Sequence, residues 1–167
     1  LEEAYGAQVS QIAATLAEHF ERGCDDSRAV RYRQQAAAQA LERYAYQEAI
    51  GHLTRGLALL QTLPETCARA RHELALQTAL GPALLARHGA AALVVEQAYV
   101  RMWELCQHVG EPSQRSAALL GLGGCHIVRG RLQTARALLR HALRCAPGAP
   151  TTADHGQAHV MLGSIAF

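Results

Sequence analysis

Lysine and asparagine are absent from this sequence of 167 residues, so all 16 of its basic residues are arginine. We attribute this bias to a GC-rich genome, because both missing residues have AT-rich codons. A phosphate-binding loop of the GxxxxGK[ST] type needs a lysine and is therefore excluded. Patterns of the GxSxG, HExxH and Cys-His-Asn kinds are missing too. The sequence predicts a protein that is not an enzyme and holds no cofactor.

Long apolar runs and aromatic residues are also scarce. No run approaches the ~18–20 residues of a membrane span, and no signal-peptide pattern is present. Aromatic residues make up only 5% of the chain, whereas helix-favouring residues such as Ala, Leu, Gln, Arg and Glu dominate. The net charge of +2 is too small to imply nucleic acid. We expect an all-α protein without membrane contact.

The cysteines are odd in number and widely spaced, and most fall on apolar helical faces. A disulfide framework would need an even set in a small secreted domain. We therefore expect reduced, buried thiols in a cytoplasmic protein. The five residues are Cys24, Cys67, Cys106, Cys125 and Cys145.

The most informative stretch runs from Leu119 to Pro147. It contains two amphipathic helical patterns, about 119–129 and 131–146, joined at Gly130. Small residues stand where the two helices must touch, and a proline closes the unit. These residues are Gly123, Ala135, Ala142 and Pro147.

Further helices are expected before and after this stretch. Gly81-Pro82 should kink or break one of them, because proline removes a donor and clashes with the preceding turn. Asp25 and Asp26 are interpreted as helix caps rather than metal ligands, since no third ligand lies at a suitable spacing. The side chains at Tyr99, Met102 and Trp103 are interpreted as core rather than as a ligand site. The additional helices are expected at about 2–22, 27–43, 47–63, 65–88, 91–109 and from 152.

The spacing of small residues in the 119–147 unit resembles the tetratricopeptide repeat (TPR), a helical pair of about 34 residues. A second pair, over 27–63, places Ala37, Ala49 and Gly56 at the same repeat positions. The resemblance implies an all-α, right-handed α–α superhelix: a TPR-like solenoid of about eight antiparallel helices with a concave inner face. The first small residue recurs about every 40 residues, as Ala37, Gly81, Gly123 and Gly163.

Longer segments are similar to one TPR subclass, the helical region that follows the ATPase module in bacterial STAND-type regulators. Those regulators include maltose-regulator-like activators and cyclase–ATPase fusions. The resemblance implies that residues 1–23 link from an upstream module and that 24–167 are TPR-like repeats, the last one incomplete. The segments are LAEHFERG (16–23), SRAVRY (27–32), AAAQALERYAYQEAIGHLTRGLALLQTLP (36–64) and LALQTALGPALLARHG (74–89).

In function, the resemblance implies a non-catalytic scaffold or sensor inside a larger bacterial regulator. Its partner would be a protein, a peptide or the regulator's own ATPase domain. The alternative is a receptor that binds a peptide or small-molecule inducer in its concave groove. A closed pocket lined by polar groups would favour the receptor, and an open apolar groove would favour the scaffold.

In the TPR family, the first helix of each pair lines the inner face. Carried over to this sequence, one set of positions is mixed in character and the other is apolar and small. The apolar set can receive an apolar side chain or another helix, unless downstream repeats cover it. The two sets are Arg31, Gln34, Ala38, Leu41 and Glu42, and Ala117, Leu120, Gly124, Ile127 and Val128.

Six arginines and no acidic residue lie between Pro112 and Ala153. Arg136, Arg140 and Arg144 form a basic stripe on one side of a helix. The stripe can bind an acidic surface or phosphates, but we favour a simple solvent-exposed face. Nucleic acid is disfavoured because no aromatic set accompanies the arginines.

Two features near the C-terminus complete the sequence evidence. The spacing of His141, Cys145, His155 and His159 is ligand-like for zinc, yet the Pro-Gly-Ala-Pro turn between the pairs favours packing or surface roles, and we expect no metal. The last helix carries apolar residues that no second helix covers, which makes a homodimer through this edge a further hypothesis. These residues are Val160, Met161, Leu162, Ile165 and Phe167.

Overall fold

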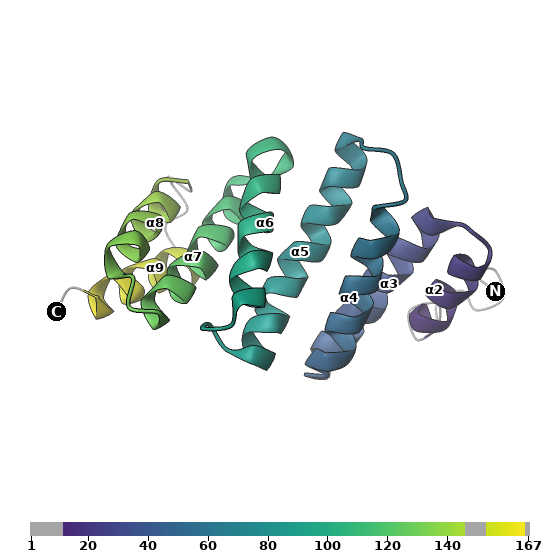
Figure 1. Ribbon diagram of the computed structural model, residues 1–167, viewed down its shortest axis with the longest axis horizontal. Helices are drawn as coiled ribbons and strands as arrows, with labels where there is room; N and C mark the ends of the chain where they lie inside the picture. The colour runs from purple at the N-terminus through teal and green to yellow at the C-terminus, as the bar shows by residue number, and fades with distance from the viewer. Residues whose placement is uncertain (1–11, 146–152, 166–167) are drawn as a thin grey trace. The chain divides into compact units, whose positions relative to one another are not determined.

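The computed structural model describes residues 12–145 and 153–165, and these residues form eight helices and no strand (Figure 1). The expected all-α class of consecutively packed helices is therefore confirmed. The chain divides into two compact units, 1–83 and 84–167. The helices are α2 (Ala13–Arg22), α3 (Asp26–Glu42), α4 (Tyr46–Leu60), α5 (Cys67–His88), α6 (Leu93–Val109), α7 (Pro112–Val128), α8 (Leu132–Cys145) and α9 (Ala153–Ser164).

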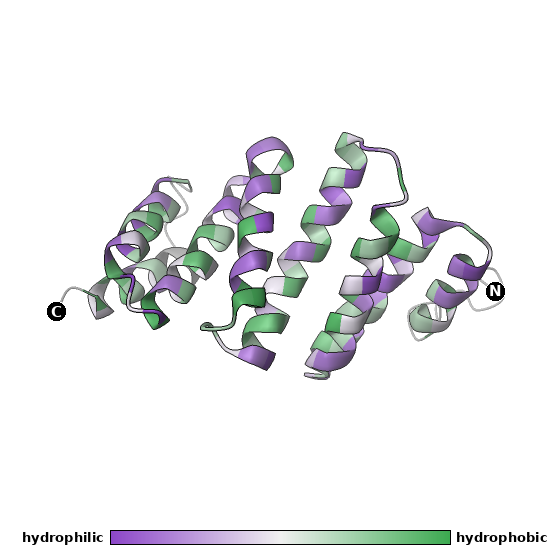
Figure 2. Ribbon diagram, viewed as in Figure 1, coloured by the Kyte–Doolittle hydropathy of each residue, from purple (hydrophilic) through white to green (hydrophobic). Residues whose placement is uncertain are grey.

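The helices are amphipathic, with hydrophobic and hydrophilic residues distributed along each of them (Figure 2). Alanine and leucine supply most of the buried side chains. Because alanine is small, neighbouring helices can approach closely where it lies at the contact. None of the helices in the described part of the chain is both long and apolar enough to cross a membrane.

In the first unit, α2 packs on α3 and α3 packs on α4. Ala37 and Ala49 are fully buried. A Cβ atom added at Gly56 of α4 would lie 3.2 Å from Cδ1 of Leu76 on α5, so the glycine leaves room for that leucine. The side chain of Asp25 accepts a hydrogen bond of 3.1 Å from the backbone N–H of Arg28 and caps α3.

In the second unit, α7 contacts α6, α8 and α9, and α8 also contacts α9. Gly121 of α7 lies against the ring of Tyr99 on α6, and Gly123 lies against Leu139 on α8. Ala135 and Ala142 of α8 are fully buried. Small residues therefore stand at the closest helix contacts in both units. Pro147 lies outside the described residues.

Three expectations for the helices need correction or restriction. The helix expected at 119–129 begins already at Pro112, where the Gln114 side chain accepts a hydrogen bond of 2.9 Å from the N–H of Glu111. Of the kink or break expected at Gly81-Pro82, the break is wrong, because α5 runs through Pro82 without interruption. Pro82 is exposed while Leu80 and Ala83 beside it are buried, so water can satisfy the freed carbonyl while packing holds the helix. The expected helix from residue 2 is described only over α2.

The expectation for the cysteines holds only in part. All five are free thiols, but only Cys106 and Cys125 are buried, whereas Cys24 and Cys67 are exposed. Cys24 stands in the turn after α2 with a φ of 57°, and Cys67 begins α5. Both lie at helix ends, where the periodic pattern of apolar residues does not predict which side chains are buried. Tyr99 and Met102 are core residues, as expected, and Trp103 is half-buried.

Candidate functional site

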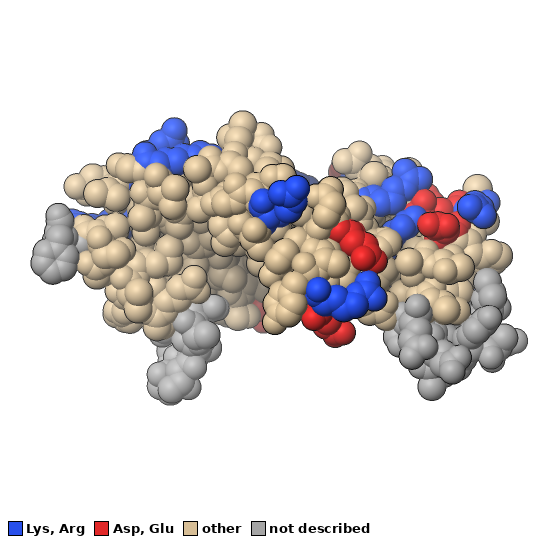
Figure 3. Space-filling view, turned by 90° about the horizontal axis from the view of Figure 1, so that it is seen from below, with Lys and Arg blue, Asp and Glu red and all other residues tan. Residues whose placement is uncertain are grey.

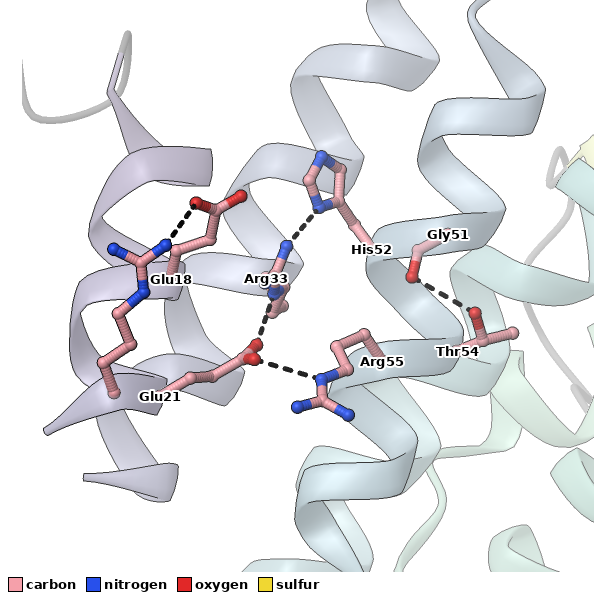
Figure 4. A network of polar contacts seen from close by, with 8 residues as sticks. Glu18, Glu21, Arg33, Gly51, His52, Thr54 and Arg55 are labelled. Atoms are coloured by element: carbon pink, nitrogen blue, oxygen red, sulfur yellow. Dashed lines mark hydrogen bonds and ion pairs between the residues drawn. The ribbon is translucent and has the colours of Figure 1, made fainter. Parts of the chain in front are cut away.

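A polar network joins the three complete helices of the first unit. Oε1 of Glu21 on α2 accepts a hydrogen bond of 2.7 Å from Nε of Arg33 on α3, and its Oε2 accepts one of 3.0 Å from Nε of Arg55 on α4. Nη1 of Arg33 lies 3.1 Å from Nδ1 of His52 on α4. Figure 4 shows Glu21 between the two arginines and Arg33 between Glu21 and His52. The side chains of Glu21 and Arg33 are only 13% and 12% exposed, so the network sits largely away from solvent.

The environment fixes the charge states of this network. Burial would raise the pKa of Glu21, but the hydrogen bonds and charges of Arg33 and Arg55 outweigh it and hold the pKa below its ordinary value of 4.5. Burial lowers the pKa of His52, and the charge of Arg33 lowers it further against the opposing pull of Glu48 and Glu18. Because Arg33 can only donate, the bond requires an unprotonated Nδ1 on His52. Glu21 is thus the anion and His52 a neutral acceptor.

The first unit is expected to lose stability as the pH falls, in two windows. A folded-state pKa below the unfolded value means that the unfolded chain binds more protons, so stability is present at high pH and lost on acidification. For His52 the loss of stability begins as the pH falls below the ordinary pKa of 6.5. For Glu21 it begins as the pH falls below the ordinary pKa of 4.5. Urea midpoints of the first unit, followed by hydrogen exchange from pH 8 to pH 3, should show both losses.

In the variants His52→Gln and Glu21→Gln, the urea midpoint should each time lose its pH dependence in one of the two pH ranges. A midpoint that stays constant or rises as the pH falls from 7.5 to 5.5 would contradict the assignment of His52 as a neutral acceptor.

The predicted inner-face residues of α3 are accessible to different degrees. Arg31 is exposed and its guanidinium lies 5.0 Å from the centre of the Tyr32 ring. Ala38 and Glu42 are exposed, while Gln34 and Leu41 are half-buried. Figure 3 shows acidic side chains beside basic ones toward the N-terminal end of the molecule. Among the described residues, Arg31, Ala38 and Glu42 of this face are therefore accessible.

The predicted inner face of α7 receives a helix of the chain itself, and the sequence had left open both a helix and a side chain as its occupant. Leu120 is buried, and Ile127 packs against the same cluster together with Ala158, Met161 and Ile165 of the C-terminal segment. A Cβ atom on Gly124 would lie 3.3 Å from Cε of Met161. Helix α9 thus occupies this face, because its apolar side matches that of α7. At its margins, Ala117 is half-buried and Val128 is exposed.

The basic stripe does not act as one surface. Nη2 of Arg136 donates a hydrogen bond of 3.0 Å to the carbonyl of Ile165, just after the end of α9. It satisfies a carbonyl that the helix end leaves without an intrahelical partner. Arg140 and Arg144 are exposed. Only these two residues retain the solvent-facing character expected of all three.

Two other arginines of the acid-free segment, Arg129 and Arg131, lie beside a carboxylate on α6, that of Glu96. Arg129 forms an ion pair with Glu96 and also donates to the carbonyl of Ala91, with Nη2 at 3.0 Å. Nη1 of Arg131 and Nε2 of His126 lie 4.0 Å and 3.8 Å from Oε1 of Glu96. This cluster joins the turn before α6 to the turn after α7. Sequence reasoning missed it because the acid lies about 30 residues from its partners.

The four residues with zinc-like spacing are not brought together as far as the structure describes them. The ring of His141 packs edge-on against Trp103, with 5.3 Å between the ring centres. His159 is exposed on α9, and the side chain of His155 lies outside the described part. Within that part, no group of three or more His, Cys, Asp or Glu side chains could hold a metal ion.

The turn between α3 and α4 presents an aromatic residue in an uncommon conformation. Tyr44 has a φ of 58°, in the left-handed region, and 77% of its side chain is exposed. The corresponding turn between α7 and α8 has Gly130 there, with a φ of 71°. Each turn is closed by the same bond, from the next N–H to the carbonyl five residues earlier, as in Ala45 to Ala40. A bulky residue thus stands where glycine is unstrained, which periodicity alone does not reveal.

A scan against models of protein families finds no match to this chain, and a search of curated proteins finds none either.

Proposed function

We propose that this chain is a non-catalytic interaction scaffold of the TPR type, within a larger bacterial regulator, and that it binds a protein partner. The observation that carries the proposal is Tyr44. Residues in strained backbone conformations persist where the structure or function requires them. Tyrosine is also enriched in protein interfaces, because it offers a large contact area with a polar tip. An exposed tyrosine held where glycine would be more stable favours selection for contact rather than for folding.

The neighbourhood of Tyr44 suits a protein interface. Tyr46 lies edge-on to Tyr44 with 6.4 Å between the ring centres, so two aromatic rings stand at one end of the α3–α4 pair. Nη2 of Arg43 and Oε1 of Glu48 form an exposed ion pair of 3.2 Å beside them. Aromatic residues with a charged surround match the usual composition of a protein contact. The open face of α3 ends at Glu42, next to this turn.

Two further expectations support a scaffold more than an inducer receptor. The inner face of α7 packs against a helix of this chain, which supports a helical protein partner over a small molecule for a face of this kind. The resemblance to STAND-type regulators implies the same role in the cytoplasm, with the ATPase domain or a separate protein as partner. The receptor alternative is left to the test below.

Tyr44→Gly is expected to stabilise the first unit by about 0.5–1 kcal/mol, because relief of the left-handed strain outweighs the entropy of the added glycine. The same change should weaken partner binding, which separates a contact role from a folding role. Stability is measured by urea unfolding of the purified chain.

Binding is tested in the organism by replacing Tyr44 with a photoreactive aromatic amino acid and analysing the crosslinked products by mass spectrometry. Ala58, which is exposed on α4, is the control position. We expect one recurring protein adduct from position 44 and none from position 58. No protein adduct from position 44, or the same adducts from both positions, would overturn the proposal, and a small-molecule adduct would favour the receptor.

A further inference from the structure

The second unit has an exposed apolar patch at the end where α6 begins and α7 ends. Arg129 joins the segments 91–96 and 126–132 there, through its ion pair with Glu96 and its hydrogen bond of 3.0 Å to the carbonyl of Ala91. The turns before α6 and after α7 lie at the same end of this unit (Figure 1). Of the eight large hydrophobic side chains that are exposed in the described part of the chain, four lie on these two segments. We call them the end patch: Leu93, Val94, Val128 and Leu132, each between 42% and 62% exposed.

Helix α9 covers a different part of α7 and leaves the end patch exposed. Met161 lies against Gly124 of α7, and Leu162 and Ile165 belong to the same packed cluster. The sequence predicted that no second helix covers these three residues, and for them the prediction is wrong because they pack on α7 and α8. Val128 lies one turn beyond Gly124 and is 59% exposed. The end patch is therefore not part of the core that α7, α8 and α9 share.

Positive charge surrounds the end patch. Residues 84–167 contain eight arginines and four acidic residues, a net charge of +4. Glu96 is the only acidic residue within 84–103 and 112–132, and Arg129 already pairs with it. Nη1 of Arg131 lies 4.0 Å from Glu96, which is too far for a hydrogen bond, and its side chain is 58% exposed. Arg131 can therefore bind a second carboxylate without breaking the pair of Arg129.

The beginning of α6 favours an anionic group at the same place. The first N–H groups of a helix attract negative charge, and a side chain at the N-cap usually accepts a hydrogen bond from one of them. Ala92 is the N-cap of α6 and makes no such bond. Asp25 makes one at α3, where its side chain accepts from the N–H of Arg28. The uncapped helix start and the exposed Arg131 lie on the two joined segments, and both favour a carboxylate.

We propose that the end patch, together with Arg131, binds a segment of a partner protein in which an acidic residue is flanked by large apolar side chains. The carboxylate pairs with Arg131, and the apolar side chains cover Leu93, Val94, Val128 and Leu132. In such a contact the apolar area supplies affinity and the ion pair fixes the register of the segment. The inference deepens the proposed function and rests on it in taking the chain to be a protein-binding scaffold.

An anionic membrane surface is a weaker match to the end patch. Helices that lie on membranes usually carry aromatic residues on the apolar side and several basic residues around it. The end patch contains only leucine and valine, and it covers two helix ends rather than one side of a helix. We therefore argue for a protein segment and let the test distinguish it from a membrane.

The probes are random peptides displayed on phage, selected on the intact chain and then depleted on the double variant Val128→Ser, Leu132→Ser. The depletion removes peptides that bind elsewhere, and it sets no requirement for charge. We expect the enriched peptides to carry Asp or Glu close to large apolar residues. Their binding to the intact chain is measured by fluorescence anisotropy.

Two variants of the chain test the ion pair. Arg131→Glu should weaken the selected peptides by about tenfold or more, because it places a carboxylate opposite the one in the peptide. Arg140→Glu is the matched control, because Arg140 is also exposed in this unit and its replacement changes the net charge equally. The control should change binding by less than about twofold, since screening by salt weakens the effect of a distant exposed charge. A peptide whose acidic residue is replaced by Arg should bind Arg131→Glu better than it binds the original chain.

Several outcomes would overturn the proposal. No enriched peptide, enriched peptides without acidic residues, or equal weakening by Arg131→Glu and Arg140→Glu would each refute the ion pair. Binding to phosphatidylserine vesicles that Val128→Ser abolishes would make a membrane the occupant. Self-association in light scattering that Val128→Ser abolishes would make a second copy the occupant. None of these results changes the crosslinks expected from Tyr44, which lies in the other unit, so either proposal can fail without the other.

Discussion

Gly121→Ala is expected to destabilise the second unit by about 2–3 kcal/mol, a large loss for so small a change. A Cβ atom there would lie 2.3 Å from Cε1 and 2.5 Å from Cζ of Tyr99. The ring cannot move aside easily, because Tyr99 is buried. Helices α6 and α7 would have to separate. Trp103, the only tryptophan of the chain, lies on α6 and reports the unfolding through its fluorescence in urea.

The control for this prediction is Gly51→Ala on α4. Gly51 has nothing within 4 Å of an added Cβ, so alanine should stabilise its helix by about 0.5–1 kcal/mol. The two substitutions are chemically identical and differ only in the space around the glycine. If Gly121→Ala also stabilised the chain, the close approach of α7 to Tyr99 would be refuted.

Glu21→Gln is expected to destabilise the first unit by about 2–3 kcal/mol, because it leaves the largely buried guanidinium of Arg33 without a counter-charge. The partner Arg55 is half-exposed and can turn to water, so Arg33 carries most of the loss. In the background of Arg33→Met the same substitution should have less than about 1 kcal/mol of effect. The original chain, the two single variants and the double variant form a double-mutant cycle. Hydrogen exchange of the α2 and α3 amides in urea measures the stability of each of the four proteins.

An exposed ion pair provides the comparison. Nη1 of Arg101 and Oε2 of Glu104 lie 3.1 Å apart on α6, with their side chains 46% and 55% exposed. Glu104→Gln should change stability by no more than about 0.5 kcal/mol. Equal losses for Glu21→Gln and Glu104→Gln would show that burial does not strengthen the network of the first unit.

The periodicity of small and apolar residues was sufficient to predict the helices and their close contacts. Gly123 and Gly56 meet leucines of neighbouring helices because only a residue without a side chain leaves room there. The prediction of a break at Pro82 was wrong. Periodicity gives the position of a proline but not the side of the helix on which its ring lies. The outward side of α5 tolerates the proline because the freed carbonyl can reach water.

Most of the candidate site depends on contacts that local patterns do not contain. Glu21 meets Arg33 and Arg55 from positions 12 and 34 residues away. The inner face at Leu120 was predicted from family positions to receive a side chain or a helix, but those positions do not say that α9 of the same chain is the occupant. The left-handed turn at Tyr44 was also missed, because helical periodicity does not report the φ of a turn residue; Cys24 and Gly130 take the same conformation in the turns after α2 and α7.

Helix α9 has one exposed face in the described chain, where Val160 is 73% exposed, and hydrogen exchange of its amides measures this exposure. In the chain alone, the amides of α9 should exchange faster than those of α7, because α7 is packed on more sides. If α9 were as protected as α7, this face would be covered, which would contradict the exposure of Val160.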